Sequence, residues 1–266
     1  MQEYYKSGRY FFAIAIIAFG VIQVVTSSFM STFLPIKQSL TLGKILLYAY
    51  SCLFLICGIT LMIDKTARLG ARIAFFLFTI AIIYPHLYNL ITDLHNPGPW
   101  SVFGETLAYS AGGLIAIGLF SPNPAAKDKV LPYPKNKIAA GRVLLASAIL
   151  IFSIQHFMYG EFIAKLIPDW IPFQIFWAYL IGLVFLTASI SLLLNIKTQL
   201  ASFLLGFMFL FWVVCLHAPR VITNPNKETE WTSLFIALGF CGIFLMLDSA
   251  CQQKKRTEFI SSKHLQ

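Results

Sequence analysis

The chain has 266 residues, of which 58% are hydrophobic and only 12% are charged. A soluble domain normally carries about a quarter of its residues as charged ones, so this composition excludes an ordinary soluble protein. The formal net charge of +9 would indicate nucleic acid binding in a soluble chain. Here the basic residues gather in short loops and tails, where they set topology and contact anionic lipid, and no nucleic acid partner is expected.

Long apolar runs follow one another along the whole chain. A helix needs about 20 mostly apolar residues to cross a bilayer. The runs that satisfy this length are 10–28, 44–63, 70–91, 103–120, 141–159, 173–194, 199–219 and 232–249. They are continuously apolar rather than alternating, which excludes strands. We therefore predict an all-α membrane protein with eight transmembrane helices, the first of them an uncleaved helix rather than a signal peptide.

The basic residues predict the orientation of these helices. If the N-terminus is inside, the only lysines and arginines outside are Lys37, Lys44, Lys165, Arg220 and Lys227. The excess of basic residues on the inner side predicts that both termini are cytoplasmic. An odd number of spans would remove this excess of basic residues on the inner side, so the distribution of charge also favours eight spans.

The chain reads as two similar halves. Residue pairs about 130 positions apart match in order, namely Gly8-Arg9 with Gly141-Arg142, Ile22-Gln23 with Ile154-Gln155, His86 with His217, Asn96-Pro97 with Asn224-Pro225, and Trp100 with Trp231. We divide the chain into a first four-helix repeat (1–120), a cytoplasmic linker (121–140), a second four-helix repeat (141–250) and a basic cytoplasmic tail (251–266). Each half has an even number of spans, which predicts parallel repeats related by an axis along the membrane normal. No pair of broken helices is recognised at matching positions.

Polar side chains inside a membrane are costly unless they find partners, so each one is informative. In the second half, Gln155 and His156 lie near the predicted outer end of the fifth span, with Tyr159 one turn further on. His217 and Arg220 stand three residues apart near the outer end of the seventh span. We predict that these five side chains line one outward-facing, ligand-binding pocket; no catalytic residue is predicted.

The first half carries weaker candidates at similar positions, Gln23, His86 and Asn89. Glutamine and histidine also link membrane helices by hydrogen bonds worth about 0.6–2 kcal/mol each, and Arg220 can simply extend to the outer interface. Two interpretations of these polar residues, a ligand-binding site and hydrogen bonds that only hold helices together, stay open. Glu105, near the start of the fourth span, is interpreted as an interfacial carboxylate.

No metal site is predicted, because His86, His156 and His217 stand on different helices and no HxxxH or HExxH spacing occurs. Haem bound by a pair of histidines is less expected than no haem. The cofactor stays unknown, and a quinone is one candidate. The five cysteines form no CxxC pair and are interpreted as small buried hydrophobic residues rather than as disulfides.

Several motifs of the second half resemble those of the bacterial DoxX-like membrane proteins. They are Gln155-His156-Phe157-Met158-Tyr159, Ile167-Pro168-Asp169-Trp170-Ile171-Pro172, Trp177-Ala178-Tyr179, His217-Ala218-Pro219-Arg220, Asn224-Pro225 and Glu230-Trp231-Thr232-Ser233-Leu234. The first half is similar, but Val24 replaces the histidine after Gln23, and Tyr88 and Asn89 stand where Pro219 and Arg220 do. The resemblance implies a four-helix unit, here doubled, in the bacterial cytoplasmic (inner) membrane, and a link to membrane redox chemistry, because founding members are associated with thiosulfate oxidation and quinone reduction.

Three functions compete at this stage. The first is a redox-associated membrane subunit that binds a quinone or small molecule in the second repeat, with His156 or His217 contacting the ligand and Arg220 holding an anionic group. The second is a non-catalytic scaffold or assembly subunit of a membrane complex, and the third is a small-solute transporter. The lipid bilayer is the expected environment in all three, and a membrane redox or assembly partner is expected in the first two.

Overall fold

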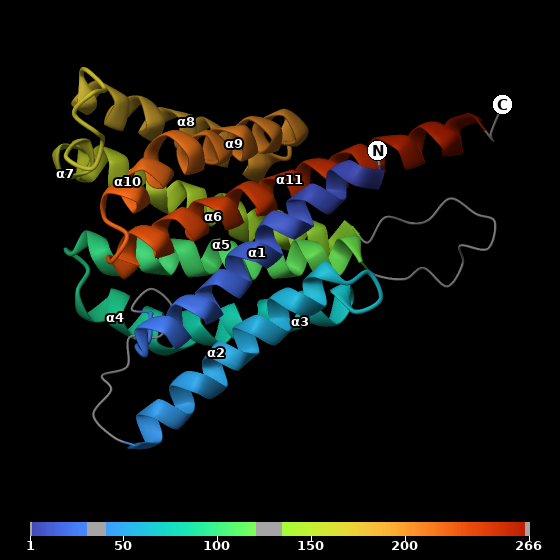
Figure 1. Cartoon of the computed structure of the whole chain (residues 1–266). Coiled ribbons are helices and arrows are strands. Elements are labelled where there is room, and N and C mark those ends of the chain that lie inside the picture. The colour runs from blue at the N-terminus through green and yellow to red at the C-terminus, as the bar shows by residue number, and fades with distance from the viewer. Residues whose placement is uncertain (1, 31–40, 121–134, 264–266) are drawn as a thin grey trace.

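The computed structural model describes residues 2–30, 41–120 and 135–263, and these residues form helices without a strand (Figure 1). The first half contains α1 (Gln2–Thr26), α2 (Thr41–Met62), α3 (Ala67–Ala81), the π-helical turn η1 (Ile82–His86), α4 (Leu87–Thr92) and α5 (Pro97–Leu119). The second half contains α6 (Lys135–Met158), α7 (Gly160–Ala164), α8 (Gln174–Leu194), α9 (Thr198–Trp212), the π-helical turn η2 (Val213–His217), α10 (Ala218–Thr223) and α11 (Glu228–Lys263).

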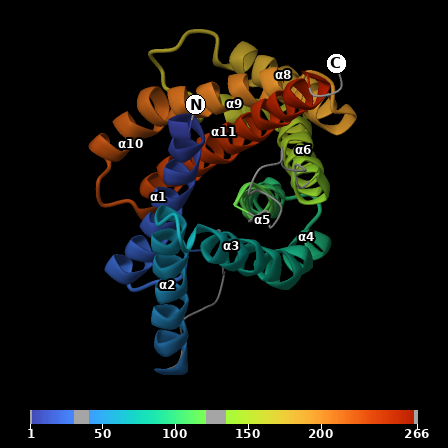
Figure 2. The same ribbon diagram turned by 90° about the vertical axis from the view of Figure 1, so that its right-hand side faces the viewer.

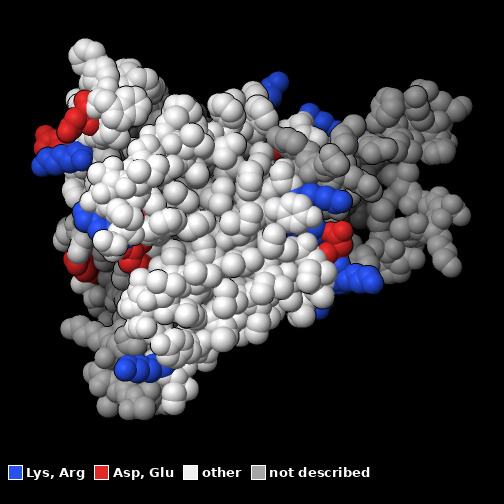
Figure 3. Space-filling model, viewed as in Figure 1, with Lys and Arg blue, Asp and Glu red and all other residues white. Residues whose placement is uncertain are grey.

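Eight helical segments of the described chain are long and apolar enough to cross a membrane. They are Lys6–Thr26, Gly43–Met62, Ala67–Thr92, Pro97–Leu119, Asn136–Met158, Gln174–Leu194, Thr198–Thr223 and Glu228–Lys255. On the face drawn in Figure 3, most lysine, arginine, aspartate and glutamate side chains lie toward the two ends, and a broad uncharged band separates them. The prediction of an all-α membrane protein with eight spans is confirmed.

The ends of some helices differ from the predicted ones for local reasons. The fourth span begins at Pro97 rather than near residue 103, because the Asn96 side chain accepts a hydrogen bond from the Gly98 amide (2.9 Å) and proline suits the first helical position. Toward the C-terminus, α11 continues to Lys263, well into the predicted tail. The glutamines and lysines there are good helix formers, so the helix continues beyond the end of the apolar run. Similarly, α6 begins at Lys135, inside the predicted linker, whose residues 121–134 lie outside the described ranges.

The two ends of the bundle are named by the termini. Helix α1 begins and α11 ends at the same end, called here the terminal end; α4, α7 and α10 lie at the opposite, distal end (Figure 1). Helix α5 lies in the middle of the bundle, with α3, α6 and α11 packed around it (Figure 2). Within each half the first two spans pair (α1 with α2, α6 with α8), and so do the last two (α3 with α5, α9 with α11).

Two close helix crossings join the halves, one between α1 and α11 and one between α6 and α5. A Cβ atom on Gly8 of α1 would lie 2.9 Å from the backbone oxygen of Gly242, and one on Gly141 of α6 would lie 3.0 Å from that of Ala111. Small residues allow membrane helices to approach this closely. Gly8 and Gly141, which match in sequence, thus occupy similar crossings, and the internal repeat stays a prediction. The rotation that relates the halves stays a prediction.

Tyr109 of α5 lies at the centre of the core. Its ring contacts Phe12 and Phe19 of α1, Phe78 of α3 and Phe240 of α11, with ring centroids 4.9–6.0 Å apart. Its hydroxyl donates to the backbone oxygens of α11 residues 235 and 236, so the one polar atom of this cluster is satisfied. Three helices of the first half are thereby fixed to the last helix of the second.

Candidate functional site

Both halves interrupt their third span with a π-helical turn that ends at a histidine. In the first half this turn is η1, which ends at His86, and in the second half it is η2, which ends at His217. Pro85 lies inside η1, and Pro219 follows η2; proline lacks the N–H of a regular helix and its ring clashes with the preceding turn. The backbone of η1 is also kinked at Tyr84, whereas η2 continues the helix without a break, so a π-helical turn is what the two spans share. Such turns are frequently found at functional sites.

The backbone after each π-turn is also similar. The indole of Trp100 donates to the backbone oxygen of Leu94 (2.8 Å), and that of Trp231 donates to the backbone oxygen of Pro225 (2.9 Å). Both bonds close the same short connection, from α4 to α5 and from α10 to α11. Each histidine thus lies between a π-helical turn and a connection closed by a tryptophan side chain.

Arg220 forms a bidentate ion pair with Glu230 of α11. Its Nε lies 2.8 Å from Glu230 Oε2, and its terminal nitrogen donates to Oε1 at 3.2 Å. The Arg220 side chain is 32% exposed and that of Glu230 is 10% exposed, so the pair is largely withdrawn from the surface. Planar, two-point pairing of this kind is stronger and more directional than a single contact. The pair fixes α10 against the start of α11.

His217 stands one turn before Arg220 and is half-buried. Its Nδ1 atom is buried and makes no hydrogen bond to any described residue. A buried ring nitrogen without a partner calls for an explanation, and a ligand that supplies a hydrogen bond is one.

Gln155 and Tyr159 face the first half rather than His217. The Gln155 amide nitrogen donates to the backbone oxygen of Pro97 (2.8 Å) and to the hydroxyl of Ser101 (2.9 Å). The Tyr159 hydroxyl donates to the backbone oxygen of His95 (3.0 Å). Gln155 and Tyr159 also border a cavity of about 80 Å³, together with Leu94, Trp100, Ile151, Ile154 and Met158. These hydrogen bonds link the end of α6 and the residue after it to the start of α5 and the connection before it.

His156 turns toward α8. Its Nδ1 is 2.8 Å from the backbone oxygen of Phe152, and its ring meets that of Phe185 edge-on at 5.2 Å. Gly182 leaves the space for it, because a Cβ atom there would lie 2.9 Å from the histidine Cβ. The neighbouring residues Gln155 and His156 therefore serve different interfaces.

The weaker candidates of the first half are largely enclosed. Gln23 and His86 are buried, whereas Asn89 is half-buried. The Gln23 side-chain oxygen accepts a hydrogen bond from the Ser51 hydroxyl of α2 (3.1 Å), so Gln23 links two helices of its own half. Glu105 is half-buried on α5, one turn from Tyr109 toward the distal end.

The five predicted residues of the second half thus lie in three groups at the distal end: Gln155 with Tyr159, His156 alone, and His217 with Arg220. Among described residues, no hydrogen bond connects one group with another. Their convergence on one pocket stays a prediction.

Sequence reasoning missed Glu230 as the partner of Arg220. The available signal was an acidic residue in the first turn of the next helix, ten positions after the arginine. It also missed Asp248 of α11, which is 1% exposed and close to the terminal end. Asp248 stands at the end of an apolar run, where a charged residue is normally interpreted as the end of a transmembrane span.

No protein-family model, curated protein or solved structure matches the chain.

Proposed function

We propose that this multi-pass membrane protein binds a quinone, or another small apolar molecule with a carbonyl or hydroxyl group, at the distal end of its second half. In this proposal it serves as a DoxX-like subunit of a membrane redox system. The observation that carries the proposal is His217, whose buried Nδ1 lacks a partner beside the Arg220–Glu230 ion pair.

The chemistry of this group suits such a ligand. A neutral histidine can donate a hydrogen bond to a carbonyl oxygen or accept one from a hydroxyl, and the two forms of a quinone offer these two partners. Arg220 is already paired with Glu230, so an anionic ligand would have to compete with that carboxylate. The geometry therefore favours a neutral ligand over an anion, which narrows the role first expected for Arg220.

The proposal includes an orientation. The distal end faces outward, both termini are cytoplasmic, and the membrane is a bacterial cytoplasmic membrane. The support is the distribution of basic residues and the family resemblance. A ligand dissolved in the bilayer can reach the distal site from the outer leaflet.

The test is the ligand content of the protein purified in its native lipids. Native mass spectrometry of the wild type should show a bound small molecule, which extraction and chromatography then identify. His217→Ala should lose it, whereas His95→Ala, an exposed histidine at the same end, should retain it. A wild type without a bound molecule, or a His217→Ala variant that retains it in full, refutes the proposal.

Two other functions have specific support. The contacts of Gln155 and Tyr159 with the first half favour a scaffold, in which polar residues only hold helices together; His217→Ala should then lower the yield of folded protein without a ligand effect. The matched π-turns favour a transporter, because interrupted helices at corresponding positions in two repeats point to a substrate site. Uptake assays in proteoliposomes separate this third function from the other two.

A further inference from the structure

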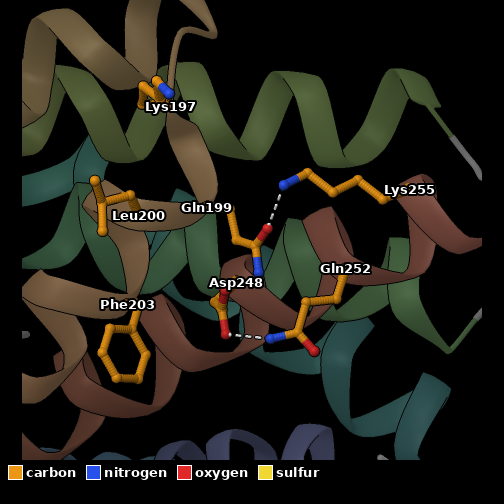
Figure 4. Close-up of a pocket in the computed structure, with 7 residues that line it drawn as sticks. All are labelled: Lys197, Gln199, Leu200, Phe203, Asp248, Gln252 and Lys255. Atoms are coloured by element: carbon orange, nitrogen blue, oxygen red, sulfur yellow. Dashed lines mark hydrogen bonds between the residues drawn. The ribbon is translucent and has the colours of Figure 1, made fainter.

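A pocket of about 710 Å³ opens at the terminal end of the second half, far from His217. It lies between the start of α9 and the last turns of α11 that belong to the membrane span (Figure 4). The residues that line it are Lys197, Gln199, Leu200, Phe203, Asp248, Gln252 and Lys255. The inference drawn from this pocket does not depend on the function proposed above.

The inner part of the pocket offers a hydrogen-bond acceptor. Asp248 is 1% exposed, and its Oδ2 accepts from the Gln252 amide at 2.9 Å. Its other oxygen, Oδ1, is buried and accepts no hydrogen bond of good geometry from a described residue, although the Gln199 amide lies nearby (Figure 4). A buried carboxylate oxygen is costly without a donor. A ligand with an N–H or O–H group would satisfy it.

The rim of the pocket is basic. Lys255 and Lys197 are both exposed, and the Lys255 ammonium donates to the Gln199 side-chain oxygen at 2.7 Å. Helix α9 starts at Thr198, so its first turn, whose dipole favours a negative charge, borders the same space. Lysine side chains on the rim of a pocket that borders a helix N-terminus suit a phosphate group.

The remaining wall is apolar and continues toward the membrane centre. Leu200 and Phe203 are about half exposed, and Leu204 and Phe207 extend the same exposed face along α9. An acyl chain could lie along this face while a headgroup occupies the polar part. A free phosphate ion would use only the rim.

We propose that this pocket binds the headgroup of a glycerophospholipid. The phosphate lies between Lys197 and Lys255, the headgroup donates a hydrogen bond to Asp248, and one acyl chain follows α9. Two common headgroups share the required chemistry, since ethanolamine carries an ammonium and glycerol carries hydroxyls. Choline carries the same phosphate but has no N–H or O–H donor, which makes it the matched negative control.

The experiment uses the full-length protein in nanodiscs that contain equal amounts of phosphatidylethanolamine, phosphatidylglycerol and phosphatidylcholine with identical acyl chains. Lipids retained after transfer to detergent are counted by native mass spectrometry. The wild type should retain the ethanolamine or glycerol lipid about tenfold over the choline lipid, the effect of one hydrogen bond to a charged group. Whichever of the two is retained identifies the donor. Equal retention of all three lipids overturns the proposal without any variant.

Variants then assign the site. Asp248→Ala should abolish the preference over the choline lipid, and the double variant Lys197→Ala/Lys255→Ala should lower retention of all three lipids. The control is Lys165→Ala/Lys227→Ala, which removes two exposed lysines at the distal end and should behave as wild type. A control that loses as much lipid as the Lys197/Lys255 variant refutes the placement. Inorganic phosphate is added in a separate arm; if it displaces the lipid and binds in its place, the ligand is a free anion and the lipid assignment is wrong.

Discussion

The crossing of α1 and α11 allows a quantitative test of how the two halves are held together. In Gly242→Ala, the new Cβ atom would lie 2.5 Å from the backbone nitrogen of Phe12 and 2.6 Å from the backbone oxygen of Gly8. Both are main-chain atoms of α1, which cannot rotate away as a side chain can. The two helices must therefore separate, and contacts along the crossing weaken.

The expected loss follows from two opposing effects. Overfilling a packed core costs about 1–3 kcal/mol, and a clash with a helix backbone belongs at the upper end of that range. Alanine in a helix is favoured over glycine by about 1 kcal/mol. The net destabilisation is about 2 kcal/mol, which lowers the Tm of a chain of this size by about 4–8 °C.

Gly206→Ala on α9 is the matched control. The nearest atom to its Cβ would be Leu245 Cδ2 at 3.3 Å, the end of a flexible side chain that can move aside. The gain in helix propensity is the same, so its Tm should stay equal to that of the wild type or rise slightly. Both variants are measured by thermal unfolding in one detergent. If Gly242→Ala unfolds at the same temperature as Gly206→Ala, the close backbone crossing is not what joins the halves.

Three further predictions concern other parts of the molecule. Gln155→Leu loses both hydrogen bonds to α5 and should lower stability by about 1–2 kcal/mol in the same unfolding assay; an unchanged Tm would show that these bonds contribute nothing. The Arg9 guanidinium holds the pKa of Asp64 below its ordinary value of 3.8, so this ion pair stabilises the protein above about pH 4 and loses its effect as the pH falls through the lower folded-state value. Asp64→Asn should therefore remove part of the decrease in Tm below pH 4, and an identical acid profile would contradict the pairing. A cysteine placed at Lys227 should react with an impermeant reagent outside intact cells and one placed at Lys129 should not; the reverse result would invert the topology.

The transmembrane spans could be predicted because they depend on little besides composition. The bilayer removes any alternative partner for the backbone, so about 20 apolar residues must form a helix. The start of α5 was placed too late because proline was taken only as a helix breaker. Asn96 followed by Pro97 is also an N-terminal signal, and the structure uses it in that way.

The partners of the polar residues could not be predicted from helical spacing alone. A π-helical turn adds one residue to the helix and rotates everything after it, so residues beyond η2 face directions that the preceding period does not predict. Arg220 follows this turn, and it pairs with Glu230 of the next helix. In α6, where the helix is regular, the separation of Gln155 from His156 follows from their adjacent positions. The sequence does not show which helices lie next to α6, so the interface that each residue contacts could not be predicted.

The halves share backbone features but differ in where charge is fixed. In the first half, the buried Arg9 is paired with Asp64 at the terminal end. The matching Arg142 of the second half donates to the backbone oxygen of Leu193 instead, with no carboxylate in that bond. Asp248 lies at this end of the second half, within the proposed lipid pocket.

At the distal end it is the second half that contains an ion pair, the one between Arg220 and Glu230. In the first half, Asn89 occupies the position that matches Arg220. The positions of the charged groups therefore distinguish the two halves at each end. Both proposed sites lie in the second half, so we expect variants in the first half to alter stability before they alter binding.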